Sequence, residues 1–305
     1  EGMSESWADV VADRIVGTSP SGRSKLLLLG AADTGKTTLL EALVVRLARR
    51  QPVAVVDADV GQSHIGPPTT VGWRIFDEKG SPAAPGWEIR EISPGDGGTT
   101  GGMAFVGDVT PVGHLLQLLA ALALCAEEAA QAAPVVLIDT PGLVAGGAAC
   151  ALWWTVQRLL RPERIVALER ENEAADLLDG LQAGLSEIEK VTAPARLRRK
   201  SPEARQMHRQ RLFAEYFQHA TPCTLNLRRL AVRSSLRAYP DEMAGRIVGL
   251  TDATGRDVAI GVVERWRRAT VTIHAPPLDV QRVRCLTVGA ARIDLPLGLE
   301  WMTWR

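Results

Sequence analysis

Residues 25–38 read KLLLLGAADTGKTT, and this stretch decides the fold. Its apolar part does not alternate with polar residues, which predicts a strand buried on both faces, as in a parallel sheet. The part from Gly30 to Thr37 fits the phosphate-binding pattern GxxxxGK[ST], whose glycines let backbone N–H groups turn toward phosphate oxygens. Lys36 then brings a positive charge to the β- and γ-phosphates, and the Thr37 hydroxyl is positioned to ligate Mg²⁺. The residues that we expect to contact a nucleotide are Gly30, Ala31, Ala32, Asp33, Thr34, Gly35, Lys36, Thr37 and Thr38.

Apolar runs alternate with helical segments along the first part of the chain. The periodicity predicts helices at 37–50, 114–133 and 148–160, and buried strands at 52–59, 103–108, 133–142 and 164–169. This alternation predicts an α/β fold with a P-loop-type parallel sheet flanked by helices. Functional loops are then expected at the carboxyl ends of the strands.

The pattern also predicts how the chain is divided. A short helix at 7–15 and a linker rich in Gly, Ser and Pro form an N-terminal segment, 1–23. The segment 24–220 is expected to hold the sheet, with an arginine-rich helical lid at about 196–218. After residue 220 the chain has short segments rich in Val, Ile and Leu, and the turn at 252–255 is typical of a hairpin. We therefore expect a small β-rich domain at 221–305.

The composition excludes several classes of protein. Lysine plus arginine and aspartate plus glutamate both total 35, so the formal net charge is zero. This excludes a wholly basic nucleic-acid coat but not a local basic patch. The four cysteines form no CxxC pair, which argues against a zinc module and a disulfide-stapled secreted domain. No secretion signal opens the chain and the longest apolar run, 115–126, is too short for a bilayer, so we expect a cytoplasmic protein without a membrane segment.

Two acids end the predicted strand at 52–59, in the segment DADVGQ. Alternate residues of a strand point to opposite faces, so only one of Asp57 and Asp59 is expected to face the phosphates. A carboxylate there can accept a proton from an attacking hydroxyl, and Gln62 can orient the acceptor or a water molecule. Solvated acids at the end of a strand are the alternative interpretation.

The predicted strand at 133–142 carries another acid, Asp139. Four apolar residues followed by Asp are typical of a Walker-B motif, which places the carboxylate near Mg²⁺. The candidate metal ligands are therefore Thr37, Asp139 and Asp59. The segment Asp139-Thr-Pro-Gly142 also fits the DxxG switch of GTPases, so a regulatory GTPase is a serious alternative. No NKxD motif, which would read guanine, occurs in the chain.

A basic helix is predicted to begin at Ser201, a good N-cap, with Pro202 at the first helical position. Arg205 and Arg209 are four residues apart and so share one face. Phosphoryl transfer needs cations around the moving group, and a mobile helix can supply them as a lid. A solvated basic face and a patch that attracts a polyanion are the alternatives. Further basic residues surround this helix, namely Arg198, Arg199, Lys200 and Arg211.

Taken in order, these motifs resemble the P-loop polynucleotide 5′-hydroxyl kinases, the RNA kinases related to the eukaryotic pre-mRNA cleavage-factor subunit and to the nucleolar pre-rRNA-processing kinase. The resemblance spans about residues 24–218. The matching segments are GAADTGKTT (30–38), DADVGQ (57–62), FVGDVTPVGH (105–114), IDTPGLV (138–144), RIVALERENE (164–173) and RKSPEARQMHRQRLFAEYF (199–217).

The resemblance implies transfer of the γ-phosphate of ATP or GTP, with Mg²⁺, to the 5′-hydroxyl of RNA or DNA. It implies Asp59 as the general base with Gln62 beside it, and Arg205 and Arg209 as arginines that contact phosphate, with Lys200 or Arg199 as a third. The segment IDTPGLV takes the place of the family's substrate clasp, in which several relatives carry Trp where this chain has Leu143. The residues expected on the acceptor side are Gln62, His64, Thr110, Pro111, Thr140, Gly142, Leu143 and Lys200.

Some side chains have two interpretations at this stage. His64 and His114 follow strand ends, and contact with a substrate phosphate and a structural hydrogen bond are about equally expected. Trp153 and Trp154 lie in an apolar helical run, which favours a core position over a stacking platform. Two other functions stay open: a regulatory GTPase or ATPase, and a scaffold that binds a nucleotide without transferring phosphate.

Overall fold

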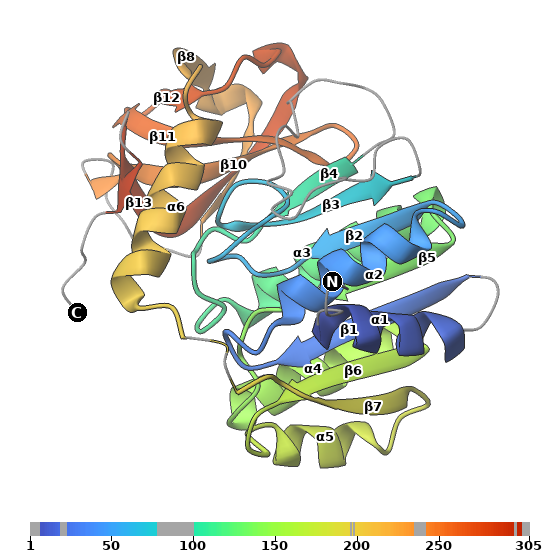
Figure 1. The fold of residues 1–305 in the computed structure, drawn as a ribbon. Coiled ribbons are helices and arrows are strands. Elements are labelled where there is room, and N and C mark those ends of the chain that lie inside the picture. The colour runs from blue at the N-terminus through green and yellow to red at the C-terminus, as the bar shows by residue number, and fades with distance from the viewer. Residues whose placement is uncertain are drawn as a thin grey trace, which may run out of the picture.

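The computed structural model describes residues 7–18, 23–77, 101–195, 197, 199–234, 242–295 and 298–300. Its strands form two sheets, drawn in Figure 1. Every strand of the first sheet comes before residue 193, and every strand of the second comes after residue 220. The linker that the sequence predicts before the first strand falls partly at 19–22, outside the described residues.

The first sheet has the order β4-β3-β2-β5-β1-β6-β7. Its strands are β1 (Ser24–Gly30), β2 (Val53–Asp57), β3 (Thr70–Phe76), β4 (Gly101–Phe105), β5 (Val135–Asp139), β6 (Arg164–Glu169) and β7 (Glu187–Thr192). The four central strands, β2, β5, β1 and β6, pair in parallel, which confirms the α/β prediction. Their carboxyl ends therefore meet at one edge, where the phosphate-binding loop begins.

The sheet is mixed rather than wholly parallel, because β3 runs antiparallel to both β2 and β4. The sequence pattern predicts no strand at 70–76 or 187–192, where β3 and β7 lie. β3 contains Gly72, whose position has no room for a side chain because a Cβ would meet the carbonyl oxygen of Ile65 at 2.0 Å. β7 is an edge strand with a largely solvent-accessible face, so it lacks the apolar run by which the central strands are recognised.

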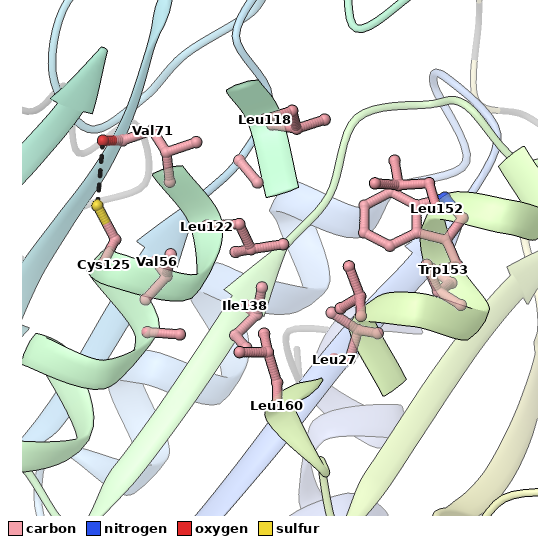
Figure 2. Packing of buried hydrophobic residues seen from close by; sticks show 14 of the residues in the cluster. Leu27, Val56, Val71, Leu118, Leu122, Cys125, Ile138, Leu152, Trp153 and Leu160 are labelled. Carbon is pink, nitrogen blue, oxygen red and sulfur yellow. Dashed lines mark hydrogen bonds between the residues drawn. The ribbon is translucent and has the colours of Figure 1, made fainter. Parts of the chain in front are cut away.

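Helices cover both faces of the first sheet (Figure 1). They are α1 (Trp7–Thr18), α2 (Lys36–Leu47), α3 (Leu115–Ala132), α4 (Gly147–Leu160) and α5 (Ala175–Leu181). Leu26 and Leu28 of β1 pack toward α1 and α2, whereas Leu27 and Leu29 pack toward α3, α4 and α5. Figure 2 shows this second cluster, in which the Cys125 thiol donates to the carbonyl oxygen of Val71. Burial on both faces explains why the sequence of β1 does not alternate.

Within the described part of the chain, one helix, α3, is long and apolar enough to cross a membrane by length and composition alone. Core helices also meet that criterion. α3 packs on β2, β3, β4 and β5 and on α4, and its buried residues, Leu118 and Leu122 among them, join the core in Figure 2. We therefore treat α3 as a helix that covers the sheet.

The second sheet has the order β14-β13-β10-β11-β12-β8, and β9 pairs with β13. Its strands are β8 (Thr221–Asn226), β9 (Ala231–Ser234), β10 (Arg246–Asp252), β11 (Asp257–Trp266), β12 (Thr270–Ala275), β13 (Val283–Asp294) and β14 (Leu299–Glu300). The pairing of β10 with β11 confirms the predicted hairpin. β8 pairs with β12 near one edge of this sheet, and β9 pairs with β13 near the other edge. Only the short 3₁₀ helix η1 (Leu227–Arg229) and Leu230 separate β8 from β9, so the sheet must curl to bring its two edges close together.

The basic helix α6 (Pro202–Tyr216) links the two sheets and lies across the second one (Figure 1). Its Phe213, together with Phe217, is buried against Ile247, Ile260 and Ile293 of the second sheet. Tyr216 Oη accepts a hydrogen bond from the backbone N–H of Ile260 at 3.0 Å. The helix thus packs on the β-rich part of the chain, whereas the sequence pattern groups it with the segment 24–220.

Candidate active site

A cleft of about 480 Å³ opens where the carboxyl ends of β1, β2 and β5 meet the start of α6. It brings together every residue that the sequence marked as catalytic, namely Lys36, Asp59, Gln62, Arg205 and Arg209. These residues come from the phosphate-binding loop, the loop after β2 and the basic helix. The remaining lining residues are Ala32, Asp33, Gly35, Thr37, Thr38, Gly61, His64, Val109, Pro111, Asp139, Thr140, Pro141, Gly142, Leu143, Leu197 and Lys200.

Lys36 lies inside the phosphate-binding loop, with only 7% of its surface exposed. Its ammonium group donates to the carbonyl oxygens of Gly30 at 2.8 Å and Ala31 at 2.9 Å. Burial lowers the pKa of Lys36, while the nearby carboxylates of Asp139 and Asp59 oppose that shift. The loop therefore holds a cation at its centre, where phosphate oxygens are expected.

Two residues of the loop adopt left-handed backbone conformations. Gly35, directly before α2, has φ 94°, a value that favours glycine. Asp33 has φ 62°, which is uncommon for a residue other than glycine. Of the nine loop residues that the sequence marked, Gly30, Ala31 and Thr34 shape the turn but do not line the cleft. The Thr34 hydroxyl donates to the carbonyl oxygen of Ala31 at 2.9 Å.

The two acids after β2 have different environments. Asp57 is buried, and its carboxylate accepts hydrogen bonds from the backbone N–H groups of Asp59, His64 and Ile65. Burial and then the neighbouring Asp139 raise the pKa of Asp57 to about 8. Asp57 thus shapes the loop, and of the two acids only Asp59 borders the cleft, as the sequence predicted.

Asp59 uses one carboxylate oxygen to organise the loop. Its Oδ1 accepts from the backbone N–H groups of Gly61 at 3.1 Å and Gln62 at 3.0 Å. Its Oδ2 has no hydrogen-bond partner among the described residues. The carboxylate therefore has a fixed orientation and one oxygen left to accept a proton.

One polar atom of Gln62 is buried without a hydrogen-bond partner among the described residues. Its amide nitrogen donates to the carbonyl oxygens of Gly61 at 2.7 Å and Arg205 at 3.3 Å. Its Oε1 is buried and has no partner among the described residues. A buried acceptor without a donor is unfavourable, and this one borders the cleft, so a ligand with a hydroxyl group would satisfy it.

Thr37 and Asp139 meet at the floor of the cleft. The Thr37 hydroxyl donates to Asp139 Oδ2 at 3.2 Å, and Asp139 Oδ1 accepts from the backbone N–H of Thr140 at 2.9 Å. Burial raises the pKa of Asp139 to about 6, while Lys36 and the hydrogen bond from Thr37 oppose that shift. No group of three His, Cys, Asp or Glu residues with metal-site geometry occurs in the described part of the chain. One hydroxyl and one carboxylate are nevertheless the donor set that Mg²⁺ uses when phosphates complete its shell.

The start of α6 is joined to the phosphate-binding loop through Asp33. The Ser201 hydroxyl caps the helix by accepting from the backbone N–H of Ala204 at 3.2 Å, as the sequence predicted. Arg205 donates to Asp33 Oδ2 at 2.5 Å, and the backbone N–H of Lys200 donates to the same oxygen at 2.9 Å. Arg170, directly after β6, donates to the carbonyl oxygens of Asp33 at 2.5 Å and Leu197 at 3.0 Å.

The second arginine of the helix has a different partner. Arg209 forms a two-pronged ion pair with Glu300 of β14, whose Oε2 lies 3.0 Å from Arg209 Nη2. Both guanidinium groups therefore border the cleft while a carboxylate balances each charge. The rings of His64 and His208 approach with centroids 6.0 Å apart, so His64 faces the helix from the other side of the cleft.

The acceptor-side residues divide between lining and support. Pro111, Gly142, Leu143, His64 and Lys200 line the cleft, as Gln62 does. Thr110 does not line it, because its hydroxyl accepts from the backbone N–H of Val112 and shapes the loop. Thr140 also lines the cleft, but its hydroxyl is buried and donates to the carbonyl oxygen of Leu28 at 2.6 Å, so the hydroxyl supports the floor.

Gly142 lies directly against the phosphate-binding loop. A Cβ at Gly142 would be 2.5 Å from the backbone nitrogen of Ala32, which leaves no room for another residue. Leu143 is partly buried against the core, and its carbonyl oxygen accepts from Trp153 Nε1 at 2.7 Å. Trp153 is fully buried, as the sequence indicated. For Trp154 the predicted core position is wrong, because its side chain lies at the surface, 39% exposed, and donates to the carbonyl oxygen of Leu177 at 3.1 Å.

Three contributors to the cleft were not predicted in these roles. They are Asp57, which shapes the loop after β2, Arg170, which ties β6 to Asp33, and Glu300, which pairs with Arg209. Arg170 directly follows a buried strand, and this position could have marked it as a candidate. No pattern in the sequence around Glu300 marks that residue. Nε2 of His114 lies 3.3 Å from Oδ2 of Asp108, and His114 does not line the cleft. Arg198 lies outside the described residues.

Comparison with known proteins gives a family for the segment that builds this cleft. Residues 30–219 match the family model described as mRNA cleavage and polyadenylation factor CLP1 P-loop. The chain is 32% identical over 210 residues to a polyribonucleotide 5′-hydroxyl-kinase of Pyrococcus furiosus, a match that covers 68% of this chain and 55% of that relative. It is 29% identical over 295 residues to the enzyme of that name from Thermococcus kodakarensis, a match that covers 92% of this chain and 79% of that relative.

The chain thus spans only about half of the length of the Pyrococcus relatives. Among solved structures, the wild-type Clp1p–Pcf11p complex contains a similar fold, with a TM-score of 0.68 and 12% sequence identity. That likeness covers 93% of this chain and 77% of the other, and so includes the second sheet. The family match covers more than half of the chain and includes the phosphate-binding loop, the acids and the basic helix, so the chain belongs to the CLP1 P-loop family.

Proposed function

We propose that the chain is a polynucleotide 5′-hydroxyl kinase, which transfers the γ-phosphate of a nucleoside triphosphate to the 5′-hydroxyl end of RNA or DNA. The observation that carries the proposal is the shared cleft. A phosphate-binding loop, an oriented carboxylate and two arginines border one cavity of about 480 Å³. The relatives named polyribonucleotide 5′-hydroxyl-kinases support RNA as the acceptor.

The donor nucleotide binds first in this scheme. Its β- and γ-phosphates lie against the backbone N–H groups of the loop and the start of α2, and Lys36 exchanges its contacts with Gly30 and Ala31 for phosphate oxygens. Thr37 and Asp139 would hold Mg²⁺ with the phosphates. When bound, Mg²⁺ supplies positive charge to the phosphate oxygens and so stabilises the transferring group.

The acceptor hydroxyl is activated by Asp59. Oδ2 of Asp59 takes the proton of the 5′-hydroxyl, and the freed electron pair of that oxygen forms the bond to the γ-phosphorus. The bond between the γ-phosphorus and the bridging oxygen breaks, and its electrons leave with the nucleoside diphosphate. Gln62 Oε1 accepts a hydrogen bond from a hydroxyl of the acceptor and so fixes its end. Asp59 is also a candidate metal ligand, and we assign it to the proton because Thr37 and Asp139 already supply a hydroxyl and a carboxylate.

The arginines stabilise the charge that spreads over the transferring oxygens. Arg205 and Arg209 border the cleft from the side of α6, opposite the phosphate-binding loop. Each is held at the cleft by a carboxylate in this structure, and its remaining N–H groups donate to the transferring oxygens. Leu143 offers apolar contact to the acceptor at the place of the clasp.

The test is transfer of labelled γ-phosphate from ATP and from GTP to short 5′-hydroxyl RNA and DNA oligonucleotides with Mg²⁺. Lys36→Ala is the control. We expect label on the oligonucleotide that is lost in the control and when Mg²⁺ is chelated. Free phosphate without labelled oligonucleotide would replace the proposal with a GTPase or ATPase. Bound nucleotide with neither transfer nor hydrolysis would replace it with a scaffold.

A further inference from the structure

Four arginines gather at one corner of the second sheet, away from the cleft lining. Arg228 and Arg229 lie in η1, which follows β8, and Arg267 and Arg268 lie in the turn between β11 and β12. The backbone N–H of Leu227 donates to the carbonyl oxygen of Ala269 at 2.9 Å, which fastens the two segments together. We call these four residues the arginine corner.

The arginine corner carries charge that no described residue balances. All four side chains are exposed. None of the four guanidinium groups has an ion pair or hydrogen bond with another described residue. Other exposed arginines near this sheet do have partners: Arg256 pairs with Glu128, Arg265 with Glu264 and Arg282 with Asp252. Four unbalanced like charges in two adjoining segments repel one another, and a bound polyanion would remove that repulsion.

The arginine corner lies at the same end of the second sheet as β14. β11 pairs with β10, and β10 pairs with β13. In this register, Arg265 and Trp266 of β11 lie at the same height along the strands as the last residues of β13, which pair with β14. β14 carries Glu300, the partner of Arg209. From β14 to β8 there are five strand spacings of about 4.8 Å, so the corner lies within roughly 24 Å of that ion pair. A single-stranded nucleic acid whose 5′ end lies in the cleft can therefore reach the arginine corner with a nucleotide several positions further along its chain.

We infer that the arginine corner binds the phosphate backbone of the polynucleotide acceptor, several nucleotides downstream of the 5′ end in the cleft. This inference rests on the proposed function. The formal net charge of the chain is zero, so the protein as a whole does not attract a polyanion and a local cluster must do so. Arginine presents a planar fork that matches phosphate oxygens, and four such contacts bind without regard to base sequence. An acidic protein segment is the competing partner, and the test separates the two.

The experiment compares a trinucleotide with an acceptor of about 20 nucleotides, both with a 5′-hydroxyl. The variant replaces all four residues of the corner with Gln: Arg228→Gln, Arg229→Gln, Arg267→Gln and Arg268→Gln. The matched control removes the same charge from exposed arginines elsewhere: Arg49→Gln, Arg50→Gln, Arg282→Gln and Arg284→Gln. Thermal unfolding shows that both variants are folded before they are compared.

For the corner variant we expect KM for the long acceptor to rise by about tenfold at low salt, with kcat and both constants for the trinucleotide unchanged. The salt dependence of oligonucleotide binding, measured by fluorescence anisotropy, should lose a slope of about 0.7 for each phosphate contact removed. The control should behave as the unaltered protein. An equal rise of KM for both acceptors, or an unchanged KM for the long acceptor, would overturn the inference.

Two further outcomes distinguish the possible failures. If the unaltered protein transfers phosphate to neither acceptor, the proposed function fails, and anisotropy still reports whether the corner binds the oligonucleotide. If a polyglutamate peptide binds the unaltered protein more tightly than the oligonucleotide and the corner variant loses that binding, the corner is a site for an acidic protein partner and the inference is wrong.

Discussion

Asp57 and Asp59 are two residues apart, yet the fold gives them different tasks. Asp57 has three backbone N–H groups around its carboxylate and is 2% exposed, so it fixes the course of the loop. Asp59 borders the cleft with one oxygen that has no partner among the described residues. The difference arises because β2 ends at Asp57, and the chain then turns so that Asp59 faces the phosphate-binding loop. This is why we propose Asp59, and not Asp57, as the group that receives the proton.

Replacing Asp59 with Asn should lower kcat for phosphate transfer by about 10² to 10⁴, the usual contribution of a general base. An amide keeps the size and the hydrogen bonds to Gly61 and Gln62 but cannot take the proton. Binding of the nucleotide, measured by calorimetry, should change little. Turnover close to that of the unaltered protein would remove Asp59 from this role.

Asp139 should make stability depend on pH in a defined direction. Burial raises its pKa to about 6, from an ordinary value of 3.8, so the folded chain holds this proton more tightly than the unfolded chain does. Between those two pH values the unfolded chain has lost the proton and the folded chain keeps it. The contribution of Asp139 to the free energy of unfolding therefore falls as pH rises through this window and is constant above it.

The variant Asp139→Asn should lack that dependence. Relative to the unaltered protein without nucleotide, its free energy of unfolding should rise between about pH 4 and pH 6 by on the order of 2 kcal/mol. Urea unfolding at closely spaced pH values measures the difference. If the difference in free energy of unfolding between the variant and the unaltered protein did not change with pH, the raised pKa of Asp139 would be wrong.

At the scale of elements, Asp33 joins the phosphate-binding loop to the basic helix. Its carboxylate accepts from Arg205 and from the backbone N–H of Lys200, while Arg170 holds its carbonyl oxygen and that of Leu197. Asp33 is 12% exposed in its side chain and Arg205 is 32% exposed, so the pair is partly shielded from solvent. This contact fixes where the helix begins over the cleft.

We expect Asp33→Asn to lower kcat about tenfold, because Arg205 loses the charge that holds it near the transferring group. A double-mutant cycle with Arg205→Lys measures the coupling between the two side chains in kcat. The effects should fall well short of additivity, because either change breaks the same contact. Additive effects would show that Asp33 acts independently of Arg205.

At the scale of the whole molecule, the second sheet supports the helix that completes the cleft. Phe213 and Phe217 bury the inner face of α6 against β10, β11 and β13, and Glu300 of β14 pairs with Arg209. The two sheets also meet directly, because the backbone N–H of Phe105 in β4 donates to Asp257 of β11 at 2.7 Å. A change in the second sheet is therefore expected to reach the cleft through α6.

Phe213→Ala should lower the free energy of unfolding by about 3 to 5 kcal/mol, since the ring is fully buried. The matched control on the same helix is Met207→Ala, at a side chain that is 68% exposed, which should change stability by no more than about 0.5 kcal/mol. Chemical unfolding followed by circular dichroism measures both. Equal effects of the two changes would show that α6 is not anchored through Phe213.

Contiguous sequence determined the local parts of this protein. The apolar run at 25–30, the glycine pattern that follows it and the Ser-Pro start of α6 each act through neighbours in the chain, so they were readable without the fold. The predicted α/β class, the hairpin of β10 and β11 and the meeting of Lys36, Asp59 and Gln62 follow from such signals, because parallel strands bring their carboxyl ends to one edge. The place of Arg205 and Arg209 beside them was implied by the resemblance to a family and not by the local pattern.

Tertiary structure decided what depends on distant partners. The antiparallel β3, the contact of Arg205 with Asp33 and the pairing of Arg209 with Glu300 join residues whose neighbours in the chain give no hint of one another. The same holds for the arginine corner, whose halves are about 40 positions apart and meet only because β8 pairs with β12. Such contacts form when packing of the sheets brings the elements together, and a local pattern does not encode which elements those are.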